Sequence, residues 1–156
     1  MKKGLIIWAL MLFAAALYAQ PAYTYTLDLT NVRDDKVKVE LIPPPVNQAS
    51  IEFQMPKIVP GTYSISDFGR FISEFKAFDK SGNEMMVEHD AAQVNRWRIP
   101  NAQQLGKITY WVDDTWDARV KENSVFEPGG TNIEAGVNFV INTFGFFGYL
   151  ENMKEL

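Results

Sequence analysis

Few side chains in this sequence can hold a metal ion. The 156 residues include one histidine, His89, and no cysteine. A catalytic zinc site takes three protein ligands, so a lone His89 between Glu88 and Asp90 does not indicate one. We expect His89 to be a solvated surface residue. Without cysteine the chain also has neither disulfides nor thiolate metal sites.

A stretch of carboxylates in the second half of the chain is a candidate calcium site, because calcium prefers oxygen ligands. Its members are Asp113, Asp114 and Asp117, with Glu122 and Glu127 beyond them. Recognisable calcium loops have a glycine at a sharp turn among the acidic residues, and residues 113–122 contain no glycine. The pattern favours a solvated acidic loop.

Other common chemistries find little support in the sequence. A nucleophilic serine needs a neighbouring base, and His89 would have to serve every serine in the chain. Pro128-Gly129-Gly130 lacks the lysine and the following helix of a phosphate-binding loop. With 15 basic and 19 acidic residues the net charge is −4, which argues against binding to nucleic acid.

Aromatic residues make up 13% of the chain, and they allow two interpretations. Exposed rings on a β-domain bind sugars or peptides, whereas buried rings fill a core that no disulfide supports. We expect most of one set to be core, namely Tyr63, Phe68, Trp97 and Trp111. Trp116 lies in the acidic stretch and is expected to be the exposed ring.

Alternation of apolar and polar residues predicts that strands position these side chains. A first hairpin is predicted over 22–42, and further strands are expected around 51–55, 85–87, 95–99, 108–112 and 137–141. The strand at 108–112 is apolar on both faces and is predicted to be central. Outside residues 1–19, only 64–76 suggests a helical turn. The sequence predicts an all-β, sandwich-like domain of two packed, mostly antiparallel sheets.

Residues 55–82 are the segment around which the chain is organised. Pro56 and Pro60 restrict the backbone and lack an N–H, and Pro60-Gly61 is a strong turn signal. Tyr63 and Ile65 alternate with polar residues, which predicts a short half-buried strand.

The first nineteen residues have the pattern of a signal peptide. Lys2 and Lys3 precede an apolar run, and small residues follow it up to Ala19. We expect cleavage there, with 20–156 as the mature domain, exported to the periplasm or the extracellular space and free of the membrane.

The string M-P-x-x-x-P-G-x-Y-x-I-x-D-F-x-R resembles the N-terminal β-domain of the glycyl aminopeptidase family of zinc metallopeptidases. The matching residues are Met55, Pro56, Pro60, Gly61, Tyr63, Ile65, Asp67, Phe68 and Arg70. The similarity extends from about Tyr23 to about Gly145, and it departs at Val59, where many relatives have an aromatic residue.

The resemblance implies that zinc belongs to a separate catalytic domain, which carries an H-E-x-x-H helix and precedes a PDZ domain. This chain has no such motif. Gly148-Tyr149-Leu150-Glu151-Asn152 is similar to the G-x-M-E-N exopeptidase motif of related enzymes, but without zinc Glu151 has no scissile bond to position. We therefore interpret that similarity as coincidence.

The leading hypothesis is a non-catalytic domain, present as a fragment or a truncated product, that packs against the catalytic domain of its parent peptidase. The expected contact residues are Pro56, Pro60, Gly61, Tyr63, Asp67, Phe68 and Arg70, and Asp67 is expected to pair with Arg70. An uncovered aromatic tail over 144–149 adds Phe144, Phe146, Phe147 and Tyr149. Two alternatives stay open. One is an exported module that binds peptide or glycan through Trp116, and the other is a cell-envelope structural protein without a small ligand.

Overall fold

The structure is a computed structural model that describes residues 22–117 and 123–154. The predicted signal peptide at 1–19 and Glu122 lie outside the described residues. No helix within the described ranges is both long enough and apolar enough to cross a bilayer.

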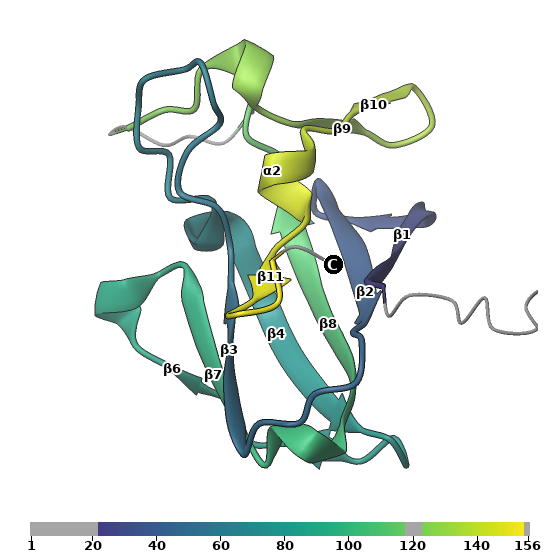
Figure 1. The fold of residues 1–156 in the computed structure, drawn as a ribbon. Coiled ribbons are helices and arrows are strands. Elements are labelled where there is room, and N and C mark those ends of the chain that lie inside the picture. Colours follow the sequence, from purple (N-terminus) through teal and green to yellow (C-terminus); the bar gives the residue numbers. More distant parts are fainter. Residues whose placement is uncertain (1–21, 118–122, 155–156) are drawn as a thin grey trace, which may run out of the picture.

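Two antiparallel sheets form the domain, and they pack against each other (Figure 1). The larger sheet has the order β1-β2-β8-β4-β5, and the smaller has the order β11-β3-β7-β6. The strands of the larger sheet are β1 (Thr24–Arg33), β2 (Lys36–Ile42), β4 (Ile72–Asp79), β5 (Glu84–Met85) and β8 (Leu105–Asp113). Those of the smaller sheet are β3 (Ser50–Gln54), β6 (Glu88–His89), β7 (Arg96–Pro100) and β11 (Tyr149–Leu150).

The remaining elements are short and connect or flank the sheets. A separate hairpin pairs β9 (Asn132–Glu134) with β10 (Asn138–Val140). The helical turns are η1 (Phe68–Phe71), η2 (Ala91–Gln93), η3 (Ala102–Gln104), η4 (Glu127–Gly129) and α2 (Thr143–Phe146). The predicted all-β, two-sheet fold is confirmed, as is the helical turn expected within 64–76.

Four aromatic rings join the two sheets in the core. Phe53 of β3 lies 5.3 Å from Phe75 of β4 and 5.6 Å from Tyr110 of β8, measured between ring centroids. Trp97 of β7 stacks on Phe75 at 4.9 Å. Tyr110 is fully buried. Since β8 pairs with β2 on one side and β4 on the other, the prediction of a central strand is confirmed. Large rings thus provide the apolar burial on which a cysteine-free domain depends.

Candidate functional site

The histidine lies on an edge strand of the smaller sheet and does not form part of a metal site among the described residues. His89 lies exposed on β6, its Nδ1 is 2.8 Å from the backbone oxygen of Arg96, and its ring stacks on Trp97 at 4.7 Å. The prediction that His89 is a surface residue is confirmed. The described residues bring no three His, Asp or Glu side chains together in a metal-binding arrangement, so they do not fit the zinc of the resembled family.

The acidic stretch is not uniformly solvated, which corrects the expectation for Asp114. Its side chain is buried, and its carboxylate accepts hydrogen bonds from the backbone N–H groups of Trp116 (2.6 Å), Asp117 (3.0 Å) and Ile133 (2.5 Å). Asp113 pairs with Lys36 at 2.7 Å. Asp114 therefore acts as an internal cap, because it satisfies backbone donors that burial would otherwise leave unpaired.

Trp116 is exposed, as predicted, with 42% of its surface accessible. Its indole Nε1–H donates to the backbone oxygen of Glu127 at 3.0 Å, and its ring edge lies against Gly130. This edge of the ring is thereby engaged within the chain.

The loop that joins β3 to η1 differs from the prediction, since residues 62–66 form no strand. Gly61 has φ +93° and Tyr63 has φ +56°, so the backbone turns twice into the left-handed region where extended pairing is impossible. Tyr63 was expected in the core, but its side chain is 96% exposed. The other three rings of that predicted core set are buried, namely Phe68, Trp97 and Trp111.

Backbone hydrogen bonds close this loop on itself. The backbone oxygen of Lys57 accepts from Ser66 N (2.7 Å) and Asp67 N (3.0 Å), and the backbone oxygen of Pro56 accepts from Phe68 N (3.2 Å). At its tip, Thr62 donates through both N and Oγ1 to the backbone oxygen of Val59. Local hydrogen bonds thus define the shape of the loop in place of the strand pairing that was predicted.

Asp67 and Arg70 stabilise the loop mainly through contacts with other residues, and a backbone hydrogen bond from Arg70 N to the oxygen of Asp67 at 3.0 Å joins the two. Asp67 accepts from Asn95 Nδ2 at 2.7 Å, and Asn95 Oδ1 in turn accepts from Gly69 N at 2.8 Å. Arg70 Nε donates to the backbone oxygen of Ser66 at 2.8 Å, and its Nη2 donates to the backbone oxygen of Asn123. Partial burial lowers the pKa of Arg70, and the nearby Asp67 charge partly offsets that effect.

The expectation of an uncovered aromatic tail over 144–149 is wrong for its centre. Phe146 is fully buried, and Phe147 and Tyr149 are half-buried; only Phe144, at 38%, counts as exposed. Three tyrosine hydroxyls hold this segment and the residues after it to the larger sheet and to the residue before β1. They donate to backbone oxygens as follows: Tyr110 to Phe146 at 2.5 Å, Tyr25 to Gly148 at 2.6 Å, and Tyr23 to Met153 at 3.0 Å. The segment covers the core of its own domain.

Glu151 lies in the turn after β11, where its backbone N–H donates to the backbone oxygen of Glu52 at 2.8 Å. Its side chain is exposed, and Leu150 beside it is buried against the smaller sheet. The G-x-M-E-N-like string is accordingly part of the strand pairing of this domain.

A groove separates the 57–66 loop from α2. Its volume is about 490 Å³, and it is lined mainly by apolar side chains: Pro56, Lys57, Ile58, Thr143, Phe144, Phe147 and Tyr149. Two predicted contact regions, the motif around Pro56 and the aromatic tail, therefore meet at one surface.

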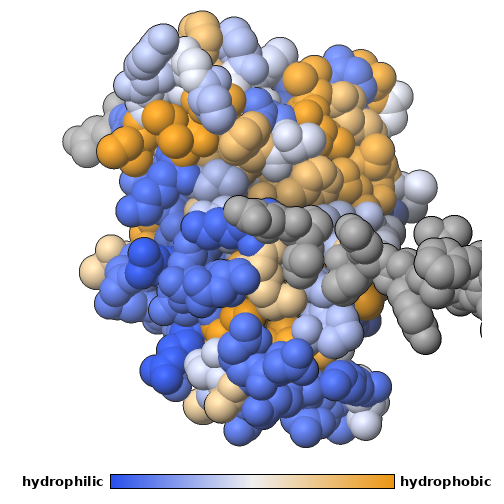
Figure 2. Space-filling model, in the orientation of Figure 1, coloured by the Kyte–Doolittle hydropathy of each residue, from blue (hydrophilic) through white to orange (hydrophobic). Residues whose placement is uncertain are grey.

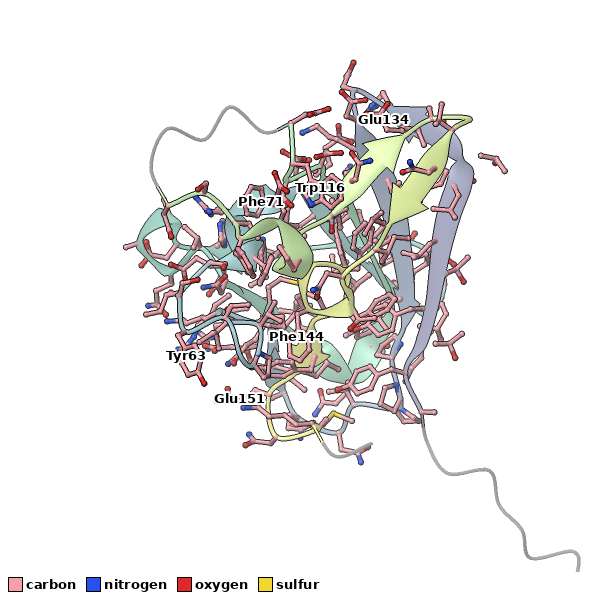
Figure 3. All side chains as sticks on the ribbon, turned by 90° about the horizontal axis from the view of Figure 1, so that it is seen from above. Tyr63, Phe71, Trp116, Glu134, Phe144 and Glu151 are labelled. Carbon is pink, nitrogen blue, oxygen red and sulfur yellow. The ribbon has the colours of Figure 1, made fainter. Side chains whose placement is uncertain are left out.

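Exposed apolar side chains are concentrated at this end of the domain. Among the described residues eleven large apolar side chains are exposed, and eight of these come from 58–65 and 116–144: Ile58, Tyr63, Ile65, Trp116, Phe126, Val137, Val140 and Phe144. The loop, the η4 segment and the β9–β10 hairpin lie together at the upper end in Figure 1. In Figure 2, apolar residues are likewise concentrated in the upper part of the face, and polar ones cover most of the lower part. Figure 3 shows Tyr63 projecting at the edge of the domain. We call this surface the apolar end.

The comparisons with known proteins agree with this architecture. The family model described as Peptidase M61 N-terminal domain matches residues 24–156. The chain belongs to this family. A structure titled as an aminopeptidase N family protein from Idiomarina loihiensis is similar, with a TM-score of 0.67 and 20% identity over 84% of this chain. This chain covers 20% of that one, so it spans about a fifth of the solved protein's length. No curated protein matches the chain.

Membership of the Peptidase M61 N-terminal domain family confirms the predicted resemblance. The likeness to the solved structure shows a shared fold. Sequence reasoning singled out Tyr63 and Phe144 but missed Ile58, Ile65 and Phe126 as exposed residues. A signal was present for two of them, since Ile58 and Phe126 each lie within two residues of a proline.

Proposed function

We propose that this chain is a non-catalytic supporting domain that packs its apolar end against the catalytic part of an exported zinc metallopeptidase. The observation that carries the proposal is the concentration of exposed apolar side chains at one end of the fold. Soluble monomers rarely leave large contiguous apolar surfaces open, and such surfaces commonly mark interfaces.

Two further observations support an interdomain contact. The family is defined by an N-terminal domain of a peptidase, and the similar solved chain is about five times longer than the part matched here. In this proposal zinc and the hydrolytic residues belong to the catalytic part, while this domain contributes shape and stability. Residues 1–19 direct export, as their composition predicts.

The test compares the chain alone with the parent polypeptide that continues beyond Leu156. We expect the chain alone to bind a dye specific for exposed apolar surface, and its melting temperature to rise when the catalytic part is attached, because any partner that binds the native state stabilises it. An isolated chain that is stable, binds no dye and gains nothing from the catalytic part would contradict the proposal. A melting shift caused by peptides or glycans, and abolished by Trp116→Ala, would instead favour a binding module. Mass spectrometry of the mature chain tests cleavage after Ala19.

A further inference from the structure

Tyr63 combines two features that are individually uncommon. Its backbone has φ +56°, a region that side chains with a Cβ occupy at a cost in free energy. Its side chain is 96% exposed, so no packing of the ring within the described domain repays that cost. Strained residues of this kind concentrate at binding sites, where the strain places a group in its working position.

The backbone that carries Tyr63 is closed at both ends. Residues 66 and 67 hydrogen-bond to Lys57, and Thr62 hydrogen-bonds twice to Val59. The backbone oxygen of Ile65 accepts from Asn123 Nδ2 at 2.8 Å. The loop therefore loses little conformational entropy when a partner binds, and this saving strengthens binding by a preorganised contact.

Exposed apolar side chains lie on the same loop as Tyr63. Ile65 is 60% exposed beside it on the loop, and Ile58, which is 42% exposed, lies on the same loop and lines the groove. A projecting aromatic ring on a loop that also lines an apolar groove suits an interface anchor, because buried Tyr and Trp residues dominate the energy of many interfaces.

We propose that Tyr63 is the preformed anchor of this domain, and that it inserts its ring into an apolar pocket of the catalytic part of the same polypeptide. This inference rests on the proposed function. The occupant follows from the similar solved protein, in which this fold is about a fifth of a much longer chain. Asp67, Phe68 and Arg70 position the anchor from within and do not themselves contact the partner.

The test measures how much the catalytic part raises the melting temperature of this domain in the parent polypeptide. Tyr63→Gly removes the ring and relieves the strain, since glycine adopts positive φ readily. We expect the isolated chain to melt at an unchanged temperature, or about 2–4 °C higher, while the rise caused by the catalytic part falls by more than half. Tyr63→Phe keeps the ring and should keep most of the rise.

Met86→Ala is the matched control, because Met86 is a 64% exposed apolar residue that follows β5, an edge strand of the larger sheet. It should keep the full rise. Ile65→Ala provides a second variant at the loop and should lose part of it. If Tyr63→Gly retains the full rise, the anchor is refuted and the proposed function stands. If the wild-type domain shows no rise, the proposed function fails, and the anchor fails with it.

Discussion

Tyr110 makes the stability of this domain sensitive to alkaline pH. Its hydroxyl is fully buried and donates to the backbone oxygen of Phe146, and burial raises its pKa well above the usual 10.0. Below pH 10 the tyrosine is protonated in both the folded and the unfolded chain. Above pH 10 it ionises only in the unfolded chain, so the folded state loses stability as pH rises.

The magnitude follows from proton linkage. One pH unit above the unfolded pKa corresponds to about 1.4 kcal/mol, so Tyr110 alone costs the domain roughly that amount at pH 11. Tyr110→Phe lacks this proton but leaves the buried oxygen of Phe146 without its donor, which costs about 1–3 kcal/mol at neutral pH. The difference in the free energy of unfolding between wild type and Tyr110→Phe should therefore narrow by about 1.4 kcal/mol between pH 8 and pH 11.

Urea denaturation followed by circular dichroism at pH 8, 9.5, 10.5 and 11 measures this gap. Ionisation of surface lysines affects both proteins equally and cancels in the difference. Tyr25→Phe is a useful second variant, because burial also raises the pKa of Tyr25, which bonds to Gly148. A gap that is as wide at pH 11 as at pH 8 would refute the assignment of Tyr110 as a buried, protonated donor.

Three substitutions test the rest of the scaffold by thermal or urea denaturation. Gly69→Ala should lower the free energy of unfolding by about 3 kcal/mol or more, since its Cβ would lie 2.2 Å and 2.6 Å from backbone atoms of residues 94–95. A variant as stable as wild type would show that the two segments can separate. Phe146→Ala should lower the free energy of unfolding by about 3–5 kcal/mol, whereas Phe144→Ala in the same helix should lower it by less than about 1 kcal/mol. Equal effects would contradict the finding that Phe146 is buried and Phe144 is exposed. Asp114→Ala should cost about 3 kcal/mol because three backbone donors lose their acceptor, and a neutral result would mean that water replaces the carboxylate.

The strands were predictable because the alternation of apolar and polar residues along each strand indicates which of its faces is buried. Val37, Val39 and Leu41 are fully buried along β2, as their spacing indicated, and the apolar run of β8 correctly placed it between two other strands. The family was also recognisable, since the motif from Met55 to Arg70 retains its residue types even where its conformation was misjudged.

The same alternation failed at Tyr63 and Ile65 because a period of two over five residues does not identify a strand without a pairing partner. The left-handed turns at Gly61 and Tyr63 direct the chain into solvent, and local hydrogen bonds replace the ladder. Phe146 shows the opposite case, since it is fully buried and its backbone oxygen accepts a hydrogen bond from Tyr110, which is far away in sequence. Local sequence determined strand pattern and family, whereas exposure of the aromatic residues was decided only by tertiary packing, because burial depends on distant segments that no local pattern encodes.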